Sequence, residues 1–220
     1  MRPWSYSRLS CYESCPKQFW YSYVENMPSF RPPHPAADRG TAIHLEGENY
    51  LKGVGHIYPA SYQKVAGHIM GLRSVKALPE HKIAVNEAWE IVDWKDATAY
   101  YRGIIDVHWY DLPTKTVNIQ DFKTGQVYPE HKQQMTDYIP LVAPLYPEAE
   151  RFTTRLVYID QGDVTPPKHV EADKLRPIRL LLDGRIANAE ADTIFPENPG
   201  SACKWCNYHG KHGGPCKVGR

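Results

Sequence analysis

Asp121 and Lys123 stand in the stretch NIQDFKTGQ, near the end of a segment that predicts a β-strand. Because side chains alternate along a strand, both residues lie on one face and Phe122 points to the other. A carboxylate can bind a divalent cation, and an amine beside it can orient a water or stabilise charge on a phosphate. The same two residues could equally be surface charges at the end of a strand.

The segment DLPTKT, residues 111–116, predicts the turn of a β-hairpin. With the turn centred between Pro113 and Thr114, Asp106 lies directly opposite Asp121. Opposed residues of an antiparallel pair have Cβ atoms about 4.5–5.5 Å apart. Two carboxylates at that distance repel unless a cation lies between them, and a hard divalent ion with oxygen ligands fits such a position. An error of one residue in the turn would undo the pairing.

His44 is the third candidate metal ligand, because it follows a predicted helix start in RGTAIH. Glu48 lies one helical turn further along the same face. Glu87, in VNEAWEIV, could face the same site from a neighbouring strand. Each of these residues could also be an ordinary core or surface side chain.

The chain has five cysteines, Cys11, Cys15, Cys203, Cys206 and Cys216. The last three follow the spacing Cys-x2-Cys-x9-Cys, which is a pattern of metal ligands. One interpretation is a zinc site with His209 or His212 as the fourth ligand. The other is an iron–sulfur cluster, which needs four thiolates and would take one from the N-terminal pair. Unligated buried thiols are the third alternative.

The elements that must position these residues alternate between helical and strand patterns. Helices are predicted at 7–24 with a break near Pro16, at 38–53, 62–77 and 129–146, and at 172–195 with an internal Pro177. Strands are predicted at 83–94, 98–111, 115–125 and 151–160, and a Cys-rich tail at 196–220. This order predicts an α/β fold with one central mixed sheet flanked by helices, in a single domain over residues 1–220.

Composition sets few limits on function. The net charge is +1, so bulk charge does not indicate a nucleic-acid binder. The sequence has no apolar run near 18 residues and no apolar signal core at its start, which predicts a cytoplasmic protein without a membrane span. An odd cysteine count in that setting favours thiol or metal chemistry over a disulfide framework.

Taken together, these residues resemble the RecB-like branch of the PD-(D/E)xK nuclease superfamily. SYSRLSCYESCPKQFWYSYV is similar to the opening helix with its Cys-Pro, and RGTAIH to the motif that ends in the metal-binding histidine. GIIDV is similar to the G-x-x-D motif, QDFKTG to (D/E)-x-K, and QMTDY to Q-x-x-x-Y. The five motifs occur in the family's order along most of the chain.

The resemblance implies a restriction-endonuclease-like core and a role for each matched residue. One or two Mg²⁺ or Mn²⁺ ions would be bound by His44, Asp106, Asp121 and the carbonyl of Phe122. Lys123 would assist the attacking water, and Gln134 and Tyr138 would contact DNA or support the site. An imidazole among the ligands leans toward Mn²⁺, although Mg²⁺ would still serve.

The resemblance also favours iron over zinc in the tail. In the subset of the family that includes the CRISPR-adaptation exonucleases, one early and three late cysteines hold a 4Fe-4S cluster. The matching residues are Cys15, Cys203, Cys206 and Cys216, with Cys11 as the alternative early ligand. The nine-residue gap before Cys216 is longer than is usual in that subset.

The function implied is metal-dependent hydrolysis of DNA, as an exonuclease that prefers single-stranded ends, with endonuclease activity as a further option. A protein partner in recombination or CRISPR adaptation is compatible with this. Candidate phosphate contacts are Arg8, Lys17, Arg39, Lys52 and Lys132, and candidate base-stacking residues are Trp4, Tyr6, Trp20 and Tyr21. Two alternatives are a non-catalytic DNA-binding adaptor that keeps the fold and a zinc-stabilised interaction module.

Overall fold

The computed structural model describes residues 3–32, 35–54 and 58–218. The chain forms two compact units. One is continuous, Pro35–Leu180, and the other joins Met1–His34 to Leu181–Arg220. A single nuclease domain spanning the whole chain therefore stays a prediction.

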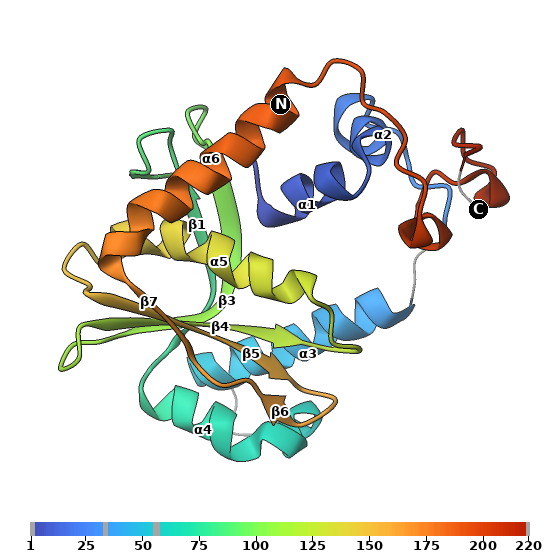
Figure 1. The fold of residues 1–220 in the computed structure, drawn as a ribbon. Coiled ribbons are helices and arrows are strands. Elements are labelled where there is room, and N and C mark those ends of the chain that lie inside the picture. Colours follow the sequence, from blue (N-terminus) through green and yellow to red (C-terminus); the bar gives the residue numbers. More distant parts are fainter. Residues whose placement is uncertain (1–2, 33–34, 55–57, 219–220) are drawn as a thin grey trace. The chain divides into compact units, whose positions relative to one another are not determined.

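The continuous unit contains a sheet of seven strands among the described residues (Figure 1). The strands are β1 (Leu78–Val85), β2 (Ile91–Val92), β3 (Tyr101–Asp111), β4 (Thr116–Lys123), β5 (Arg151–Tyr158), β6 (Asp163–Val164) and β7 (Lys168–Glu171). Their order is β2-β1-β3-β4-β5-β6, and β7 also pairs with β5. Only β4 and β5 are parallel, so the sheet is mixed. The predicted α/β fold with a central mixed sheet is confirmed.

The hairpin of β3 and β4 has the register that the predicted turn requires. Val107 pairs with Gln120 and His108 with Ile119, which continues to Asp106 opposite Asp121. The turn closes through a hydrogen bond from the Lys115 amide to the Leu112 carbonyl. The β-branched and aromatic residues of both segments explain why they form long strands.

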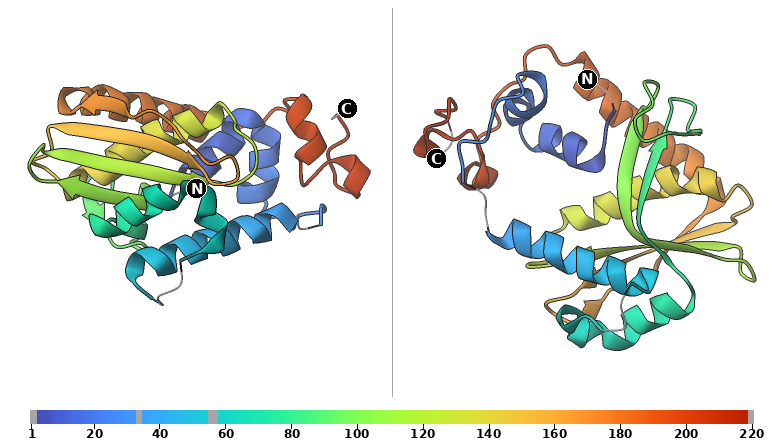
Figure 2. Two further views of the ribbon diagram at one scale, coloured as in Figure 1. Left: turned by 90° about the horizontal axis from the view of Figure 1, so that it is seen from below. Right: turned by 180° about the vertical axis from the view of Figure 1, so that it is seen from behind.

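Helices cover both faces of this sheet (Figures 1 and 2). On one face lie α3 (Pro35–Lys52), the 3₁₀ helix η2 (Ala60–Val65) and α4 (Ala66–Ser74). Their apolar side chains pack with Phe122 and Val157 into a continuous core. The other face is covered by α5 (Glu130–Val142), which continues into the short 3₁₀ helix η3 (Ala143–Leu145). This arrangement brings α3 and α5 to the same end of β4 from opposite faces.

The second unit begins with α1 (Tyr6–Ser14), α2 (Pro16–Phe19) and a π-helical turn η1 (Trp20–Val24). Cys15 separates the first two helices in an extended conformation, with φ −160° and ψ 105°. A residue before proline is disfavoured in the helical region, so Pro16 causes the predicted break. Cys15 therefore lies at the junction between α1 and α2.

The N-terminal helices of this unit pack against the second half of α6 (Leu175–Ala191) and the tail. Trp4 donates a 2.9 Å hydrogen bond to Glu190, and Tyr12 donates one of 2.9 Å to Asp192. Trp4 is fully buried and stacks on Phe19 with ring centroids 5.4 Å apart. The prediction that Trp4 stacks unpaired DNA bases is therefore wrong, because its ring belongs to the core.

Several element ends differ from the predicted ones for local reasons. The strand predicted at 83–94 is two strands, because Asn86 and Glu90 close a turn between β1 and β2. A 3₁₀ turn, η4 (Ala172–Lys174), precedes α6, and Pro177 lies in the first turn of α6, where a proline removes no helical hydrogen bond. None of the described helices is long and apolar enough to cross a membrane.

Candidate metal centre

Three side chains from three elements of the continuous unit converge at the end of the hairpin. His44 comes from α3, Glu80 from β1 and Asp106 from β3. The Nδ1 atom of His44 is 3.3 Å from Glu80 Oε1 and 3.4 Å from Asp106 Oδ2. One potential ligand atom of each residue lies within 4.8 Å of the others. Such spacing lets one ion contact all three.

Glu80 is the carboxylate that the sequence interpretation missed. Pro79 pairs with Val107 and His81 with Ile105, which places Glu80 opposite Asp106 across β1 and β3. Glu80 has a φ of +48°, so the backbone is irregular here. Glu87, the predicted contributor, instead lies in the exposed turn between β1 and β2. The missing signal was the start of β1, five residues earlier than predicted.

Asp106 is fixed by the neighbouring strand. Its Oδ2 atom accepts a 2.7 Å hydrogen bond from the backbone N–H of Phe122, and its side chain is buried. The Phe122 ring points the other way and packs edge-on against Tyr62, as the strand alternation predicted. The backbone of Phe122 therefore borders the site, while the ligand role of its carbonyl stays a prediction.

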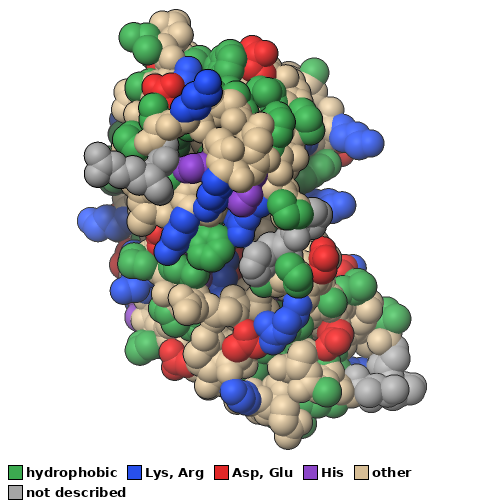
Figure 3. Space-filling model, turned by 90° about the vertical axis from the view of Figure 1, so that its right-hand side faces the viewer, with side chains coloured by type: hydrophobic (Ala, Val, Ile, Leu, Met, Phe, Trp, Pro, Cys, Tyr) green, Lys and Arg blue, Asp and Glu red, His purple; other side chains and the backbone are tan. Residues whose placement is uncertain are grey.

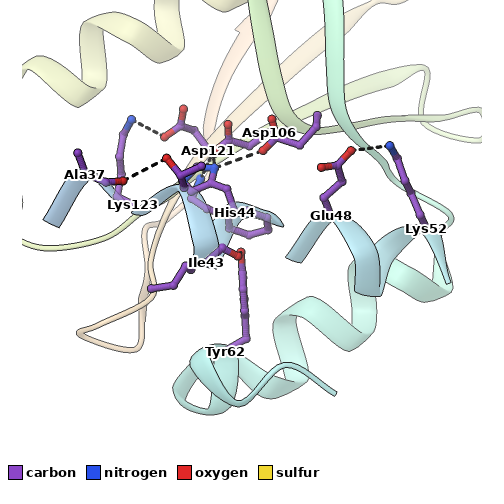
Figure 4. A network of polar contacts seen from close by, with 12 residues as sticks. Ala37, Ile43, His44, Glu48, Lys52, Tyr62, Asp106, Asp121 and Lys123 are labelled. Atoms are coloured by element: carbon purple, nitrogen blue, oxygen red, sulfur yellow. Dashed lines mark hydrogen bonds and ion pairs between the residues drawn. The ribbon is translucent and has the colours of Figure 1, made fainter. Parts of the chain in front are cut away.

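Asp121 and Lys123 form a second group with two residues of α5. Lys123 Nζ donates to Gln134 Oε1 over 2.7 Å and lies 2.6 Å from Asp121 Oδ2. The amide nitrogen of Gln134 donates to Asp121 Oδ1 over 3.1 Å and to the Tyr138 hydroxyl over 2.6 Å. Figure 4 shows Lys123, Asp121, Asp106 and His44 gathered at this end of the hairpin. The structure thus brings the side chains of four predicted residues, His44, Asp106, Asp121 and Lys123, to one end of the hairpin, while their roles stay predictions.

One oxygen in this group is incompletely satisfied. Asp121 Oδ2 is buried and accepts no hydrogen bond among the described residues, although Lys123 Nζ is close enough for an ion pair. A buried carboxylate oxygen without a hydrogen bond is costly unless another charge compensates it. The Lys123 ammonium supplies such a charge to Asp121, and a cation near Asp106 and Asp121 would add to it.

The charges of the site change the proton affinities of its members. Burial raises the pKa of Asp106 well above its usual range, and the nearby charge of Asp121 raises it further. Burial alone would lower the pKa of His44, but its hydrogen bond to Glu80 and the charges of Asp106 and Glu80 raise it to about 9. Protons therefore partly neutralise these acids where no cation does so.

The donor set fits a hard divalent ion. Two carboxylates and an imidazole supply oxygen and nitrogen atoms at a spacing suited to one centre, and Asp121 offers a further oxygen beside them. His44, Glu80 and Asp106 are the residues that would hold the ion. Glu48, the other candidate on α3, is engaged one turn away in an ion pair with Lys52.

The second unit contains a cavity whose lining includes Cys15, Cys203, Cys206 and Cys216. Backbone N–H groups point to two of the sulfurs, from Gly200 to Cys203 over 3.3 Å and from Tyr208 to Cys206 over 3.5 Å. Such bonds stabilise negative charge on sulfur. The four cysteines that the resemblance implied thus surround one space.

Two other residues near this cavity bear on the zinc alternative. Cys11 is not among the lining residues, and burial raises its pKa to about 12, which keeps a thiol protonated. His209 does line the cavity, but its Nδ1 atom accepts a hydrogen bond from the Lys211 amide. Its Nε2 atom is buried and has no hydrogen-bond partner in the described chain, so His209 keeps one nitrogen for a ligand.

Four of the five residues predicted to contact phosphates interact with neighbouring side chains of the protein. Arg39 forms a two-point ion pair with Asp160, and Lys52 pairs with Glu48. The guanidinium of Arg8 lies 4.7 Å from the ring centroid of Tyr23, and Lys17 Nζ lies 5.0 Å from that of Trp20. Lys132 is exposed on α5. Arg39 and Arg8 therefore have clear structural roles.

Comparison with known proteins finds one family model and a solved structure that are similar to this chain. A family model described as "PD-(D/E)XK nuclease superfamily" matches residues 3–101, which include His44 and Glu80 and end before Asp106. A solved structure named "Crystal structure of SSO0001" is 18% identical and has a TM-score of 0.50. That match covers 94% of this chain and 83% of the other, and it concerns the fold alone. No curated protein matches the sequence.

Proposed function

We propose that this protein is a metal-dependent deoxyribonuclease that hydrolyses phosphodiester bonds from free ends and prefers single-stranded DNA. The observation that carries the proposal is the group of His44, Glu80 and Asp106 beside the Asp121–Lys123 pair. Imidazole and carboxylates next to a fixed amine are the components that hydrolysis of a phosphodiester requires. The superfamily match supports the same reaction class.

The residues have separable roles in this proposal. A divalent ion held by His44, Glu80 and Asp106 would supply charge neutralisation at the phosphate and a water of lowered pKa. Lys123 has three N–H donors, and Asp121 and Gln134 engage its ammonium from two sides. The remaining N–H can orient the attacking water or a phosphate oxygen. Mg²⁺ and Mn²⁺ both suit the ligand set.

Gln134 and Tyr138 position Lys123 and Asp121 in this scheme. One amide of Gln134 holds both members of the pair, and Tyr138 accepts the second N–H of that amide. Burial of Tyr138 raises its pKa well above the usual range, so its hydroxyl stays protonated. A neutral hydroxyl beside Asp121 adds no charge to a site that is already rich in acids.

The surface charge makes a local mode of DNA binding necessary. The net charge is +1, and both basic and acidic side chains are exposed on the face drawn in Figure 3. Non-specific attraction of DNA by overall charge is therefore weak. Cations close to the metal centre must do most of the electrostatic work.

The test is digestion of end-labelled linear DNA, single-stranded and double-stranded, beside circular single-stranded DNA, in Mg²⁺ or Mn²⁺. We expect linear single strands to be shortened and circles to survive. The variants D121A and K123A should lose at least ~100-fold in rate while remaining folded. The matched controls D111N and K115A change the same residue types at the other end of the hairpin and should keep full activity.

A second candidate function has a distinct outcome in this assay. If the parent protein binds DNA but cleaves neither linear nor circular strands with either ion, the non-catalytic adaptor replaces the nuclease. Cleavage of circles as fast as linear strands would instead replace the exonuclease by an endonuclease. Full activity in D121A would remove the proposed catalytic centre.

We also propose that the cysteine cavity holds a 4Fe-4S cluster, with zinc as the alternative. Support comes from the four lining thiols and from the N–H groups directed at Cys203 and Cys206. The cluster would join the two chain ends within the second unit and would have a structural role. The purified protein should contain iron and sulfide and absorb near ~400 nm, as thiolate-bound iron does. A colourless protein with one zinc per chain would replace iron by zinc.

A further inference from the structure

An open groove adjoins the metal centre within the continuous unit. It has an empty volume of about 1060 Å³ and lies between the ends of α3 and α4 and the start of β1. Glu80 lines it at one point and is also the β1 member of the metal group. The groove therefore opens directly beside the place where a scissile phosphate would lie.

Three cations line this groove, Lys52, Arg73 and Lys76. Lys52 Nζ forms an ion pair with Glu48 Oε1 at 2.5 Å. The guanidinium of Arg73 lies over the ring of Tyr50, 4.6 Å from its centroid. The ammonium of Lys76 is exposed and has no acidic partner among the described residues. Glu80 is the one acid among the lining residues, and the metal centre uses it.

The backbone at Lys76 argues for a role beyond solubility. Lys76 follows the end of α4 with a φ of +54°, in the left-handed region. Glycine or asparagine is the usual residue at such a helix end, and a residue with a Cβ pays about 1 kcal/mol there. Glu80, four residues on, also has a positive φ. Strained residues cluster at functional sites, which motivates the hypothesis that these two side chains are used.

We propose that this groove binds the phosphates next to the scissile phosphate on the same DNA strand. Lys76 is the principal contact, and Arg73 and Lys52 are further contacts. The inference rests on the proposed function for its ligand, a single DNA strand. A strand that presents one phosphate at Glu80, His44 and Asp106 can continue past Glu80 into the groove. A lysine ammonium suits this position because it recognises phosphate as a point charge, without selecting a base sequence.

The decisive variant is K76G. Glycine removes the ammonium and also removes the backbone strain, so the protein should be at least as stable as the parent, with a Tm up to about 2–4 °C higher. Binding of a labelled oligothymidylate in EDTA, where cleavage cannot occur, should weaken about fivefold. The slope of log affinity against log salt should fall by about 0.7, the value for one phosphate contact on a single strand.

Lys115 offers a matched control for both effects. It is an exposed lysine with a φ of +47°, at the β3–β4 turn, which is the opposite end of β4 from Lys123. K115G also removes a lysine and the same kind of strain, away from the groove, although Lys115 is ion-paired with Glu150. Its affinity for the oligothymidylate should stay within about twofold of the parent.

The outcomes separate this inference from the proposed function. If K76G binds the oligothymidylate like the parent, or if K115G weakens binding as much as K76G does, the groove is not the DNA path. That result leaves the nuclease standing if D121A still abolishes cleavage. If the parent never cleaves DNA but K76G alone weakens binding, the groove stands and the catalytic proposal is lost.

Discussion

The metal centre and the cysteine cavity differ in what holds their side chains before any ion binds. At the metal centre the chain itself supplies partners: His44 contacts Glu80 and Asp106, and Lys123 contacts Asp121. In the cavity the ligands come from opposite ends of the chain, Cys15 from one and three cysteines from the other. Short 3₁₀ turns, η5 (Ser201–Trp205) and η6 (Gly210–His212), carry the tail between the cysteines.

Only the cysteine cavity should need its metal in order to fold. A sheet with helices on both faces positions the acids and the histidine, so that site forms whether or not an ion is present. A Cys-rich tail of short turns buries little apolar surface, and metal binding then contributes directly to its folding free energy. We therefore expect metal loss to abolish activity at one site and to unfold the other.

The largest effect should come from C15S. Loss of a thiolate from the cavity should remove nearly all bound iron and make the chain ends sensitive to protease, because the tail loses its link to the N-terminal helices. Iron content and limited proteolysis measure both. C11S, one helical turn away and outside the cavity lining, should keep its iron. If C11S loses iron while C15S retains it, Cys11 and not Cys15 is the N-terminal ligand.

The next largest effect should come from E80Q, which removes one charged ligand from a preformed site. E80Q keeps the size of the side chain but removes its charge, so the ion is held more weakly and the cleavage rate should fall about 100-fold. The free energy of unfolding should change by less than about 1 kcal/mol. E87Q is the matched control in the neighbouring turn and should cleave DNA normally; equal losses in both variants would remove Glu80 from the centre.

The pH dependence of the metal-free site gives a smaller effect. The pKa of His44 is raised from 6.5 to about 9, so its ion pairs stabilise the fold fully below pH 6.5 and are lost as the pH rises through 9. The raised pKa of Asp106 acts in the same direction, because ionising this buried acid costs stability. The free energy of unfolding in EDTA should fall by about 2 kcal/mol across this interval.

The control for this titration is H44Q, which lacks the ionising ring and should flatten the upper part of the curve. Added Mg²⁺ should restore stability mainly at high pH, because its ligands must lose their protons before they bind. Stability that rises with pH in EDTA would contradict the raised pKa of His44.

Much of the site followed from local patterns. The turn at 111–116 and the alternation of β3 and β4 fixed which faces Asp106, Asp121 and Lys123 occupy, and the structure has that register. Pro16 set the position of Cys15 in the same way, since the residue before a proline is extended. Patterns of this kind are readable because the determining residues are neighbours in sequence.

Contacts between distant residues escaped the sequence interpretation. Glu80 enters the site through a pairing across β1 and β3 at a point where its own backbone is irregular, so no alternation marks it. Arg39 looked like a phosphate contact, yet Asp160 neutralises it from 121 residues away. The N-terminal Trp4 looked like a stacking platform but fills a core beside Phe19. Charge and aromaticity are visible in a sequence, whereas partners depend on the fold.

The smallest predicted effect tests whether the preformed site depends on its outer contacts. Tyr138→Phe removes the acceptor of one Gln134 N–H, which loosens the amide that positions Lys123 and Asp121. We expect kcat to fall about fivefold with KM unchanged, and stability to fall by about 1 kcal/mol, the usual loss for one hydrogen bond. Steady-state kinetics and thermal unfolding measure the two losses.

Tyr110 provides the matched variant on β3. Its hydroxyl is buried and has no hydrogen-bond partner in the described chain, so Tyr110→Phe should leave kcat unchanged and stability unchanged or slightly higher. An equal kcat loss in both variants would mean that either ring supports the site by packing alone. A loss confined to Tyr138→Phe shows that the site, unlike the cysteine cavity, keeps its geometry through hydrogen bonds that the chain makes without a metal.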